Sequence, residues 1–418
     1  MRLMIAWRNL STKPAQSILT VLVIAAAFGM MALITLLSGG IHNGLVAATE
    51  PFDLIAGAKG SPNQLVLNTV FLQDAPIGNV SYQLYEQLSA SPLVAAAIPL
   101  AFGDTYKGYA IVGAGSGIFE HQPRAGQPKW LQLATGRPFT QPFEAVAGAA
   151  AARKLGLKPG DQFTSLHGSI PGGEEHHDHP YQIVGILQPV HGPYDHAILT
   201  SIESIWQAHE HAHEHEPDDT ARTSHEHEHE HDDTAETSHE HEHEVTAVMV
   251  KPKGYSEAMR LYQQFQREPG GQLIFPAQVI VRLFAIMGQG EQVLKTIAYA
   301  IIAMGLTIMT LSVYWSALSR SRERAVLRAL GAGTRDIFVI ILAEAALLTG
   351  LGVAIGSLAG HGTYILLAKA MAAKTAIVLT TAFTPAEGGL IAGGVLAGLL
   401  AGIIPAVLAC RTEVARDL

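Results

Sequence analysis

Cysteine is almost absent from this chain. Among 418 residues only Cys410 is a cysteine, so no disulfide can form within the chain. The sequence also contains no Gly-Lys dipeptide, and this excludes a Walker A loop, which needs a lysine directly after its last glycine. The chain therefore cannot bind ATP in the manner of P-loop ATPases.

Basic charge is scarce as well. The net charge is −9, but residues 209–244 alone hold ten Glu, four Asp and one Arg, which gives this segment −13 and the remainder +4. A value of +4 is ordinary for a chain of this size and gives no basic surface of the kind that nucleic acids require. We therefore expect no nucleic-acid partner.

Charged residues are almost missing from four long apolar stretches, at 17–37, 296–318, 337–359 and 390–409. A hydrocarbon core of roughly 30 Å needs about 20 such residues in a helix, so each stretch is long enough to cross a bilayer. Glu344, in the third stretch, is the only acidic or basic residue within them. The sequence predicts a membrane protein with four transmembrane α-helices in a 1+3 layout and an α+β domain outside the membrane between helices 1 and 2.

The basic residues near the span ends predict the orientation. Arginine and lysine gather before the first span, between spans two and three, and after span four. With four spans these three groups fall on one side, which the positive-inside rule makes the cytoplasm. We expect both termini inside and the large domain outside, with lipid around an uncleaved first span.

The segment pattern divides the chain into an entry helix and first span (1–38), an outer domain (39–290) and a membrane domain (291–418). In the outer domain, 181–187 and 245–250 read as buried strands, and 81–88 and 255–266 as helices. Residues 279–295 read as a stalk helix that runs into span two. Residues 1–16 read as an amphipathic helix at the inner surface, anchored by Trp7.

A histidine-rich tract interrupts the outer domain. Residues 211–224 and 225–238 are tandem copies that match at 11 of 14 positions. Such a composition cannot bury enough apolar surface to fold, so we predict a disordered insert at 209–244. Imidazole is a good ligand for zinc, copper and nickel. The alternative is a repeat expansion that a loop merely tolerates.

The candidate metal ligands are the histidines of this tract and those of a smaller cluster before it. They are His209, His211, His213, His215, His225, His227, His229, His231, His239, His241, His243, His176, His177 and His179. We expect binding of several ions with low specificity, and no cofactor that the protein requires.

Two segments of the tract, 209–213 and 225–229, match the H-E-x-x-H signature of metalloproteases. That chemistry needs both histidines on a rigid helix with the glutamate as general base. In a disordered tract the match follows from the His-Glu repeat alone, so a protease is a weak hypothesis.

The link between spans two and three, 319–335, carries a more specific pattern. It is basic and helical in pattern, and ends at two glycines. Its segment ERAVLRALGA (323–332) resembles the signature of FtsX/MacB-like ABC transporter permeases. AWRNLSTKPAQSILT at 6–20 resembles this family's entry into span one, and GRPFTQPFEAVAGAAAARKLGLKPGDQF at 136–163 resembles its MacB-type periplasmic core. The sequence departs from the family in its C-terminal tail, TEVARDL.

The resemblance implies a bacterial inner-membrane permease whose α+β domain between helices 1 and 2 is periplasmic. It would work as a homodimer or paired permease with a separate ABC ATPase. The link would be the coupling helix that docks into that ATPase. Its candidate docking residues are Glu323, Arg324, Arg328, Ala329 and Gly331. Glu344 would be either a buried partner for an arginine or a coupling element.

The main hypothesis is thus an ABC permease of the mechanotransmission type, not itself an enzyme, linked to zinc or another divalent metal. A periplasmic metal-binding or substrate protein is a further expected partner. The alternative from another class is a metal-buffering or scaffold membrane protein that performs no transport and regulates a periplasmic partner.

Overall fold

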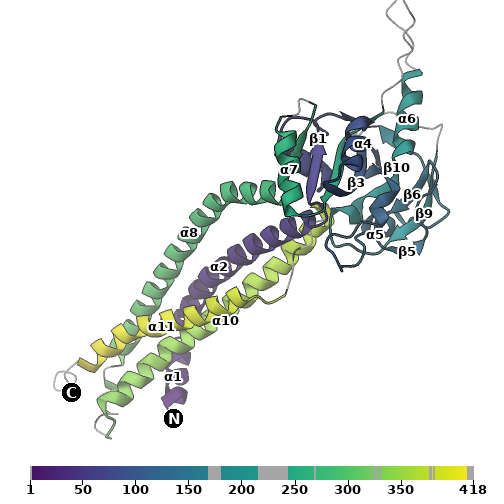
Figure 1. Cartoon of the computed structure of the whole chain (residues 1–418). Coiled ribbons are helices and arrows are strands. Elements are labelled where there is room, and N and C mark those ends of the chain that lie inside the picture. The colour runs from purple at the N-terminus through teal and green to yellow at the C-terminus, as the bar shows by residue number, and fades with distance from the viewer. Residues whose placement is uncertain are drawn as a thin grey trace, which may run out of the picture. The chain divides into compact units, whose positions relative to one another are not determined.

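The structure is a computed structural model of the whole chain (Figure 1). It describes residues 2–167, 180–214, 243–267, 270–320, 322–323, 326, 328, 331–375, 379 and 382–411. The chain divides into two compact units, Met1–Asn43 with Phe284–Ala372 and Leu379–Leu418, and Gly44–Leu283 with Ala373–Val378. We call them the helical domain and the α+β domain.

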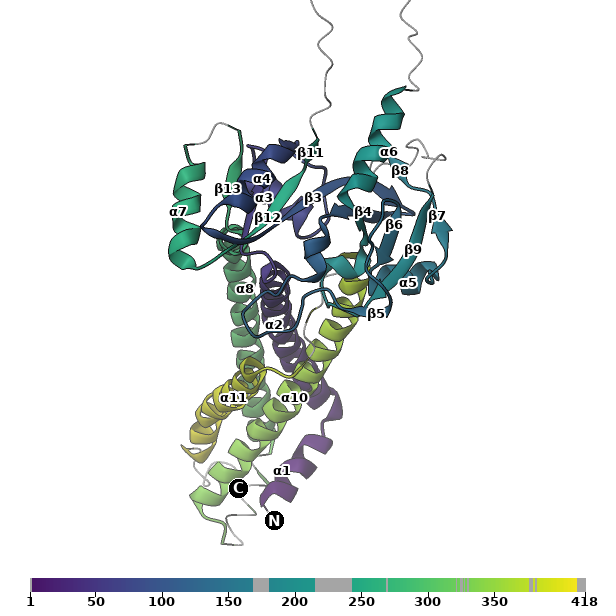
Figure 2. The same ribbon diagram turned by 45° about the vertical axis from the view of Figure 1, so that its right-hand side comes forward.

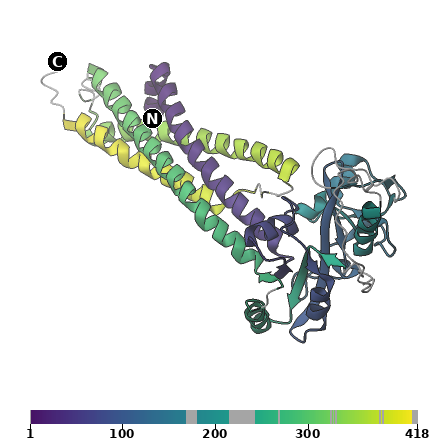
Figure 3. The same ribbon diagram turned by 90° about the horizontal axis from the view of Figure 1, so that it is seen from above.

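The helical domain contains the four predicted spans. Its helices are α1 (Arg2–Ser11), α2 (Pro14–Thr49), α8 (Pro276–Ser319), α10 (Thr334–Thr375) and α11 (Pro385–Arg411). All but α1 are long and apolar enough to cross a membrane. The predicted stalk is confirmed as part of α8, which continues into span two without a break. Figure 3 shows α2 and α8 running alongside each other, and Thr20 Oγ1 contacts Ser312 Oγ between them at 3.2 Å.

Small residues allow the helices to pack closely. A Cβ on Gly356 of α10 would lie 2.3 Å from the carbonyl oxygen of Ala25 on α2. On the next helix, a Cβ on Gly398 of α11 would lie 2.2 Å from Thr349 Cγ2 of α10. Glycines spaced by four residues thus bring α10 against both neighbours within one chain, as small-residue interfaces do in membranes.

The entry helix is shorter than the predicted 1–16, because α1 ends at Ser11 and α2 begins at Pro14. Proline cannot continue a helix but suits the first turn of a new one. The Thr12 hydroxyl donates to the Asn9 carbonyl at 2.8 Å, and this satisfies one of the backbone carbonyl groups at the C-terminal end of α1. Trp7 is 57% exposed, as an interfacial anchor would be.

The α+β domain is built on one mixed sheet, with eleven strands among the described residues, in the order β13-β1-β12-β3-β4-β10-β6-β9-β5, while β7 pairs with β9 and β8 with β3. The neighbours β12, β3 and β4 are antiparallel and can be followed in Figure 2. The pairs β10–β4 and β6–β9 are parallel. The strands are β1 (Leu54–Gly57), β3 (Val94–Tyr106), β4 (Tyr109–Ala114), β5 (Leu133–Gly136), β6 (Glu144–Ala147), β7 (Gln162–Phe163), β8 (Leu166–His167), β9 (Tyr181–Leu187), β10 (Ile198–Ser201), β12 (Ala247–Pro252) and β13 (Gln272–Ile274).

Helices cover this sheet and complete its core. They are α3 (Pro62–Thr69), α4 (Tyr82–Ala90), α5 (Ala149–Leu155), α6 (Ile202–Glu214) and α7 (Tyr255–Phe265), with short 3-10 turns at Ser116–Phe119 and Pro193–His196. Leu88 of α4 and Leu261 of α7 are buried together with strand residues such as Val248. The predicted helices at 81–88 and 255–266 are confirmed, and Ser81 caps α4 by accepting a hydrogen bond from Gln83 N.

Two details of the sequence prediction are wrong. The expected strand 245–250 is split at Thr246, so that β11 (Glu244–Val245) pairs with β2 (Val80–Ser81) apart from the main sheet. The expected disordered insert 209–244 is too wide at both ends, because α6 continues to Glu214 and Glu244 already belongs to β11. Buried residues at helical spacing, Ile202, Ile205 and Ala208, start the helix, and its backbone hydrogen bonding continues into the polar residues.

Candidate functional site

The link between α8 and α10 presents part of its surface to solvent. Arg322, Glu323 and Val326 are helical and exposed, and the Val326 side chain is 57% accessible. An exposed apolar side chain beside charged ones is typical of the centre and rim of a protein contact. Glu323 is one of the predicted docking residues, whereas Arg322 and Val326 are not among them.

The far end of the link is held against α11. Arg328 is half-buried, and its Nη2 donates to the Cys410 carbonyl at 3.3 Å. Gly331 has a φ of +96° and its N–H donates to the Arg328 carbonyl at 3.0 Å, a left-handed conformation that glycine adopts without strain. Arg324 and Ala329 lie outside the described residues.

Glu344 lies inside α10 and is 3% exposed. Asn9 Nδ2 of α1 donates to Glu344 Oε1. Both side chains border a cavity of about 70 Å³, which Arg320 and Glu323 of the link also line. The acidic side chain in span three is therefore joined to the entry helix, a partner that no sequence pattern indicated.

The predicted metal ligands fall mostly outside what the structure describes. Those outside are His215, His225, His227, His229, His231, His239, His241, His176, His177 and His179. His209, His211 and His213 lie on the backbone of α6. Within the described part of the chain, no group of three or more His, Cys, Asp or Glu side chains is placed to hold a metal ion.

The helical backbone of α6 corrects one argument about the H-E-x-x-H match. His209 and His213 stand four residues apart on a helix, not in a disordered tract. The second match, 225–229, lies outside the described residues. Disorder is therefore no argument against a protease at 209–213. A helical backbone under the first match is not by itself a catalytic site, so the protease stays a weak hypothesis.

The histidine tract returns to the fold at the helix from which it leaves. His243 stacks on Trp206 of α6 with ring centroids 4.2 Å apart, and Trp206 Nε1 donates to the Glu244 carbonyl at 2.8 Å. Tyr82 of α4 packs edge-on against the same indole at 5.0 Å. The aromatic contacts of Tyr82, Trp206 and His243 thus hold the C-terminal end of the tract against α6.

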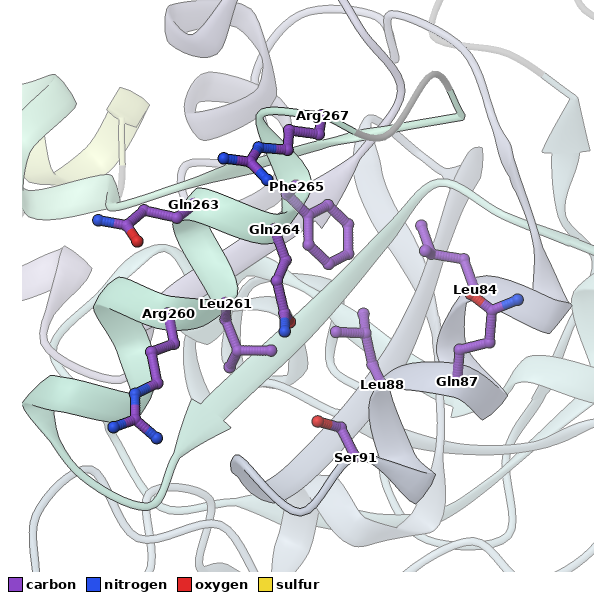
Figure 4. A pocket seen from close by; sticks show the side chains of 10 residues that line it. All are labelled: Leu84, Gln87, Leu88, Ser91, Arg260, Leu261, Gln263, Gln264, Phe265 and Arg267. Carbon is purple, nitrogen blue, oxygen red and sulfur yellow. The ribbon is translucent and has the colours of Figure 1, made fainter.

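A groove of about 620 Å³ lies between α4 and α7 (Figure 4). Leu84, Leu88, Leu261 and Phe265 line it with apolar surface. Its polar lining comprises Gln87, Ser91, Arg260, Gln263, Gln264 and Arg267. Guanidinium groups match carboxylate and phosphate geometry, so the groove has the chemistry to bind an anionic group that carries an apolar part.

Comparisons with known proteins identify both domains. Residues 17–266 match the family model for the MacB-like periplasmic core domain, and residues 295–414 match that for the FtsX-like permease C-terminal domain. No curated protein matches the chain.

Two solved structures resemble the chain at low identity. The periplasmic region of MacB from Actinobacillus actinomycetemcomitans is 9% identical, with 56% of this chain and 95% of that chain covered and a TM-score of 0.33. The extracellular domain of the noncanonic ABC-type transporter YknZ from Gram-positive bacteria is 12% identical, with coverages of 53% and 98% and a TM-score of 0.30.

The first family model spans more than half of the chain, and the second follows it in the order that the sequence predicts. The chain belongs to the family of FtsX/MacB-like ABC transporter permeases.

Proposed function

We propose that this permease couples a separate ABC ATPase to movement of its α+β domain, with the link 319–335 as the docking element. Permeases of this family work with a separate ABC ATPase and are not themselves enzymes. One observation carries the proposal: the link exposes Arg322, Glu323 and Val326, while Arg328 ties its far end to α11. A docking surface that is anchored to α11 at one end can pass a displacement by the ATPase on to the helical domain.

The proposed orientation places the link and both termini in the cytoplasm and the α+β domain in the periplasm of a bacterial inner membrane. The basic residues Arg320, Arg322, Arg328 and Arg335 in one short link support it. A homodimer or paired permease surrounded by lipid is the assembly we propose.

We also propose that the histidine tract binds zinc or a similar divalent ion. Its eleven histidines supply the ligands, and the Trp206–His243 stack fixes where the tract meets the fold. Metal bound by the tract would affect the position of α4, because Tyr82 of that helix contacts the Trp206 indole. An extracytoplasmic metal-binding or substrate protein remains the partner that we expect for this domain.

The test is ATP hydrolysis by the partner ABC ATPase, reconstituted with the full-length protein in lipid. An Arg322→Glu/Val326→Asp variant should lose stimulation by about tenfold or more, in the range typical of coupling between sites. Arg153→Glu, an exposed arginine of α5, is the matched charge reversal and should behave as the parent. Loss in both variants, or in neither, would count against the link.

Two further arms of the assay test the metal. Zinc should change the stimulated rate of the parent but not that of a variant lacking 215–242. If the parent neither binds nor stimulates the ATPase, the metal-buffering or scaffold function becomes the better proposal.

A further inference from the structure

The carboxylate of Glu344 is part of a polar cluster at the start of the link. Burying a charged group within a membrane span is costly unless it is hydrogen-bonded. The Asn9 side-chain amide supplies such a bond from a residue 335 positions away in the sequence. The contact therefore ties α1 to α10.

A second set of contacts ties α1 to the end of α8. Arg320, the residue after α8, donates from Nη2 to the Asn9 carbonyl at 2.6 Å and also to Thr12 Oγ1. Lys13 Nζ donates to Ser319 Oγ at 2.8 Å. Asn9 thus binds the link through its backbone and α10 through its side chain.

The cluster borders a small cavity that both the link and α10 line. The cavity of about 70 Å³ beside it is lined by Asn9, Ser316, Arg320, Glu323 and Glu344 among others, and it is large enough to hold water. Glu323, exposed on the link, and Glu344, buried in α10, border the same cavity. A displacement of Glu323 with the link would therefore change the surroundings of Glu344.

The outer surface of α1 is apolar. Leu3, Met4 and Trp7 are each more than half exposed, a pattern that suits a helix lying at the lipid headgroups. A helix that lies at the headgroups and is also bonded through Asn9 would move together with the link and α10.

We propose that Asn9, Arg320 and Glu344 are positioning residues that make α1 part of the coupling path. Arg320 holds the start of the link against α1, and Asn9 holds α1 against Glu344 of α10, so that a displacement of the link by the ATPase moves the two helices together. This inference rests on the proposed function of the link.

The experiment uses the full chain in lipid with its ATPase at pH 8. Asn9→Asp removes the amide N–H that donates to Glu344 and puts a second carboxyl group in its place. We expect the ATPase to bind with unchanged affinity while its stimulation falls by about tenfold. Asn9→Asp/Glu344→Gln restores an amide–carboxylate pair with its polarity reversed, and should recover most of the stimulation.

The outcomes separate this inference from the proposed function. No stimulation by the parent chain overturns the proposed function. Normal stimulation by Asn9→Asp overturns only the inference that Asn9, Arg320 and Glu344 are positioning residues. Loss of ATPase binding together with stimulation, without recovery in the double variant, also overturns it, because the pair would then serve folding and not transmission.

Discussion

At the scale of single residues, Glu144 shows how a loop of the α+β domain is fixed. Its carboxylate accepts hydrogen bonds from the Arg137 guanidinium and from the Thr140 and Gln141 N–H groups, at 2.8 and 3.2 Å for the two amides. The Arg137 hydrogen bond, together with the smaller effects of the Thr140 and Gln141 amides, lowers the pKa of Glu144 from 4.5 to about 2. The ionised carboxylate is therefore bound more strongly in the folded state than in the unfolded one.

This pKa shift predicts an acid-sensitive contribution to stability. Because the folded pKa is below the unfolded value, the contribution is complete above about pH 4.5 and is lost as the pH falls toward 2. Glu144→Gln should lower stability near neutral pH by roughly 1 kcal/mol, since Arg137 is half exposed and solvent screens the pair. It should also flatten the fall in Tm between pH 5 and 3.

The measurement is thermal unfolding of the full chain in detergent across that pH range. Glu86→Gln, an exposed carboxylate on α4, is the control and should follow the parent. Equal acid sensitivity of Glu144→Gln and the parent would contradict the assignment.

At the scale of elements, two glycines of α10 have unequal roles that the sequence alone does not reveal. Gly356 faces the backbone of α2, whereas a Cβ on Gly362 would meet no heavy atom within 4 Å. The first glycine is required for close helix contact and the second is not.

Gly356→Ala should therefore destabilise the helical domain by about 1–3 kcal/mol through overpacking. Gly362→Ala should be neutral or should stabilise by about 0.5–1 kcal/mol, because alanine favours a helix over glycine. Thermal unfolding of both variants in the same detergent measures the difference. Similar melting temperatures for the two would show that α2 and α10 are not in close contact.

At the scale of the whole molecule, α8 is the continuous element that begins in the α+β domain and ends at the link. It runs from Pro276 to Ser319, and the boundary between the two units falls at residues 283 and 284. Under the proposed function, this helix transmits movement between the ATPase side and the α+β domain.

Gly290→Pro should interrupt that transmission, because an internal proline removes a helix hydrogen bond and costs about 3 kcal/mol. We expect ATPase stimulation to persist while the ATP-dependent change in hydrogen exchange of α+β-domain peptides disappears. Gly290→Ala, at a position with no heavy atom within 4 Å of an added Cβ, should keep both. An unchanged exchange response in Gly290→Pro would show that α8 need not be continuous.

The sequence by itself determined the four spans, the α+β class of the intervening domain and the stalk that runs into span two. These follow from apolar length, helical spacing and turn residues, which are local properties. The family resemblance also lay in contiguous segments, and the family models confirm it.

Only the tertiary structure decided which distant groups meet. It joined Asn9 to Glu344, stacked His243 on Trp206 and turned Gly356 toward α2. It also corrected the predicted boundaries of the disordered insert, because α6 and β11 continue into 209–244. Periodicity tells which face of an element is buried, but it does not tell what that face is buried against.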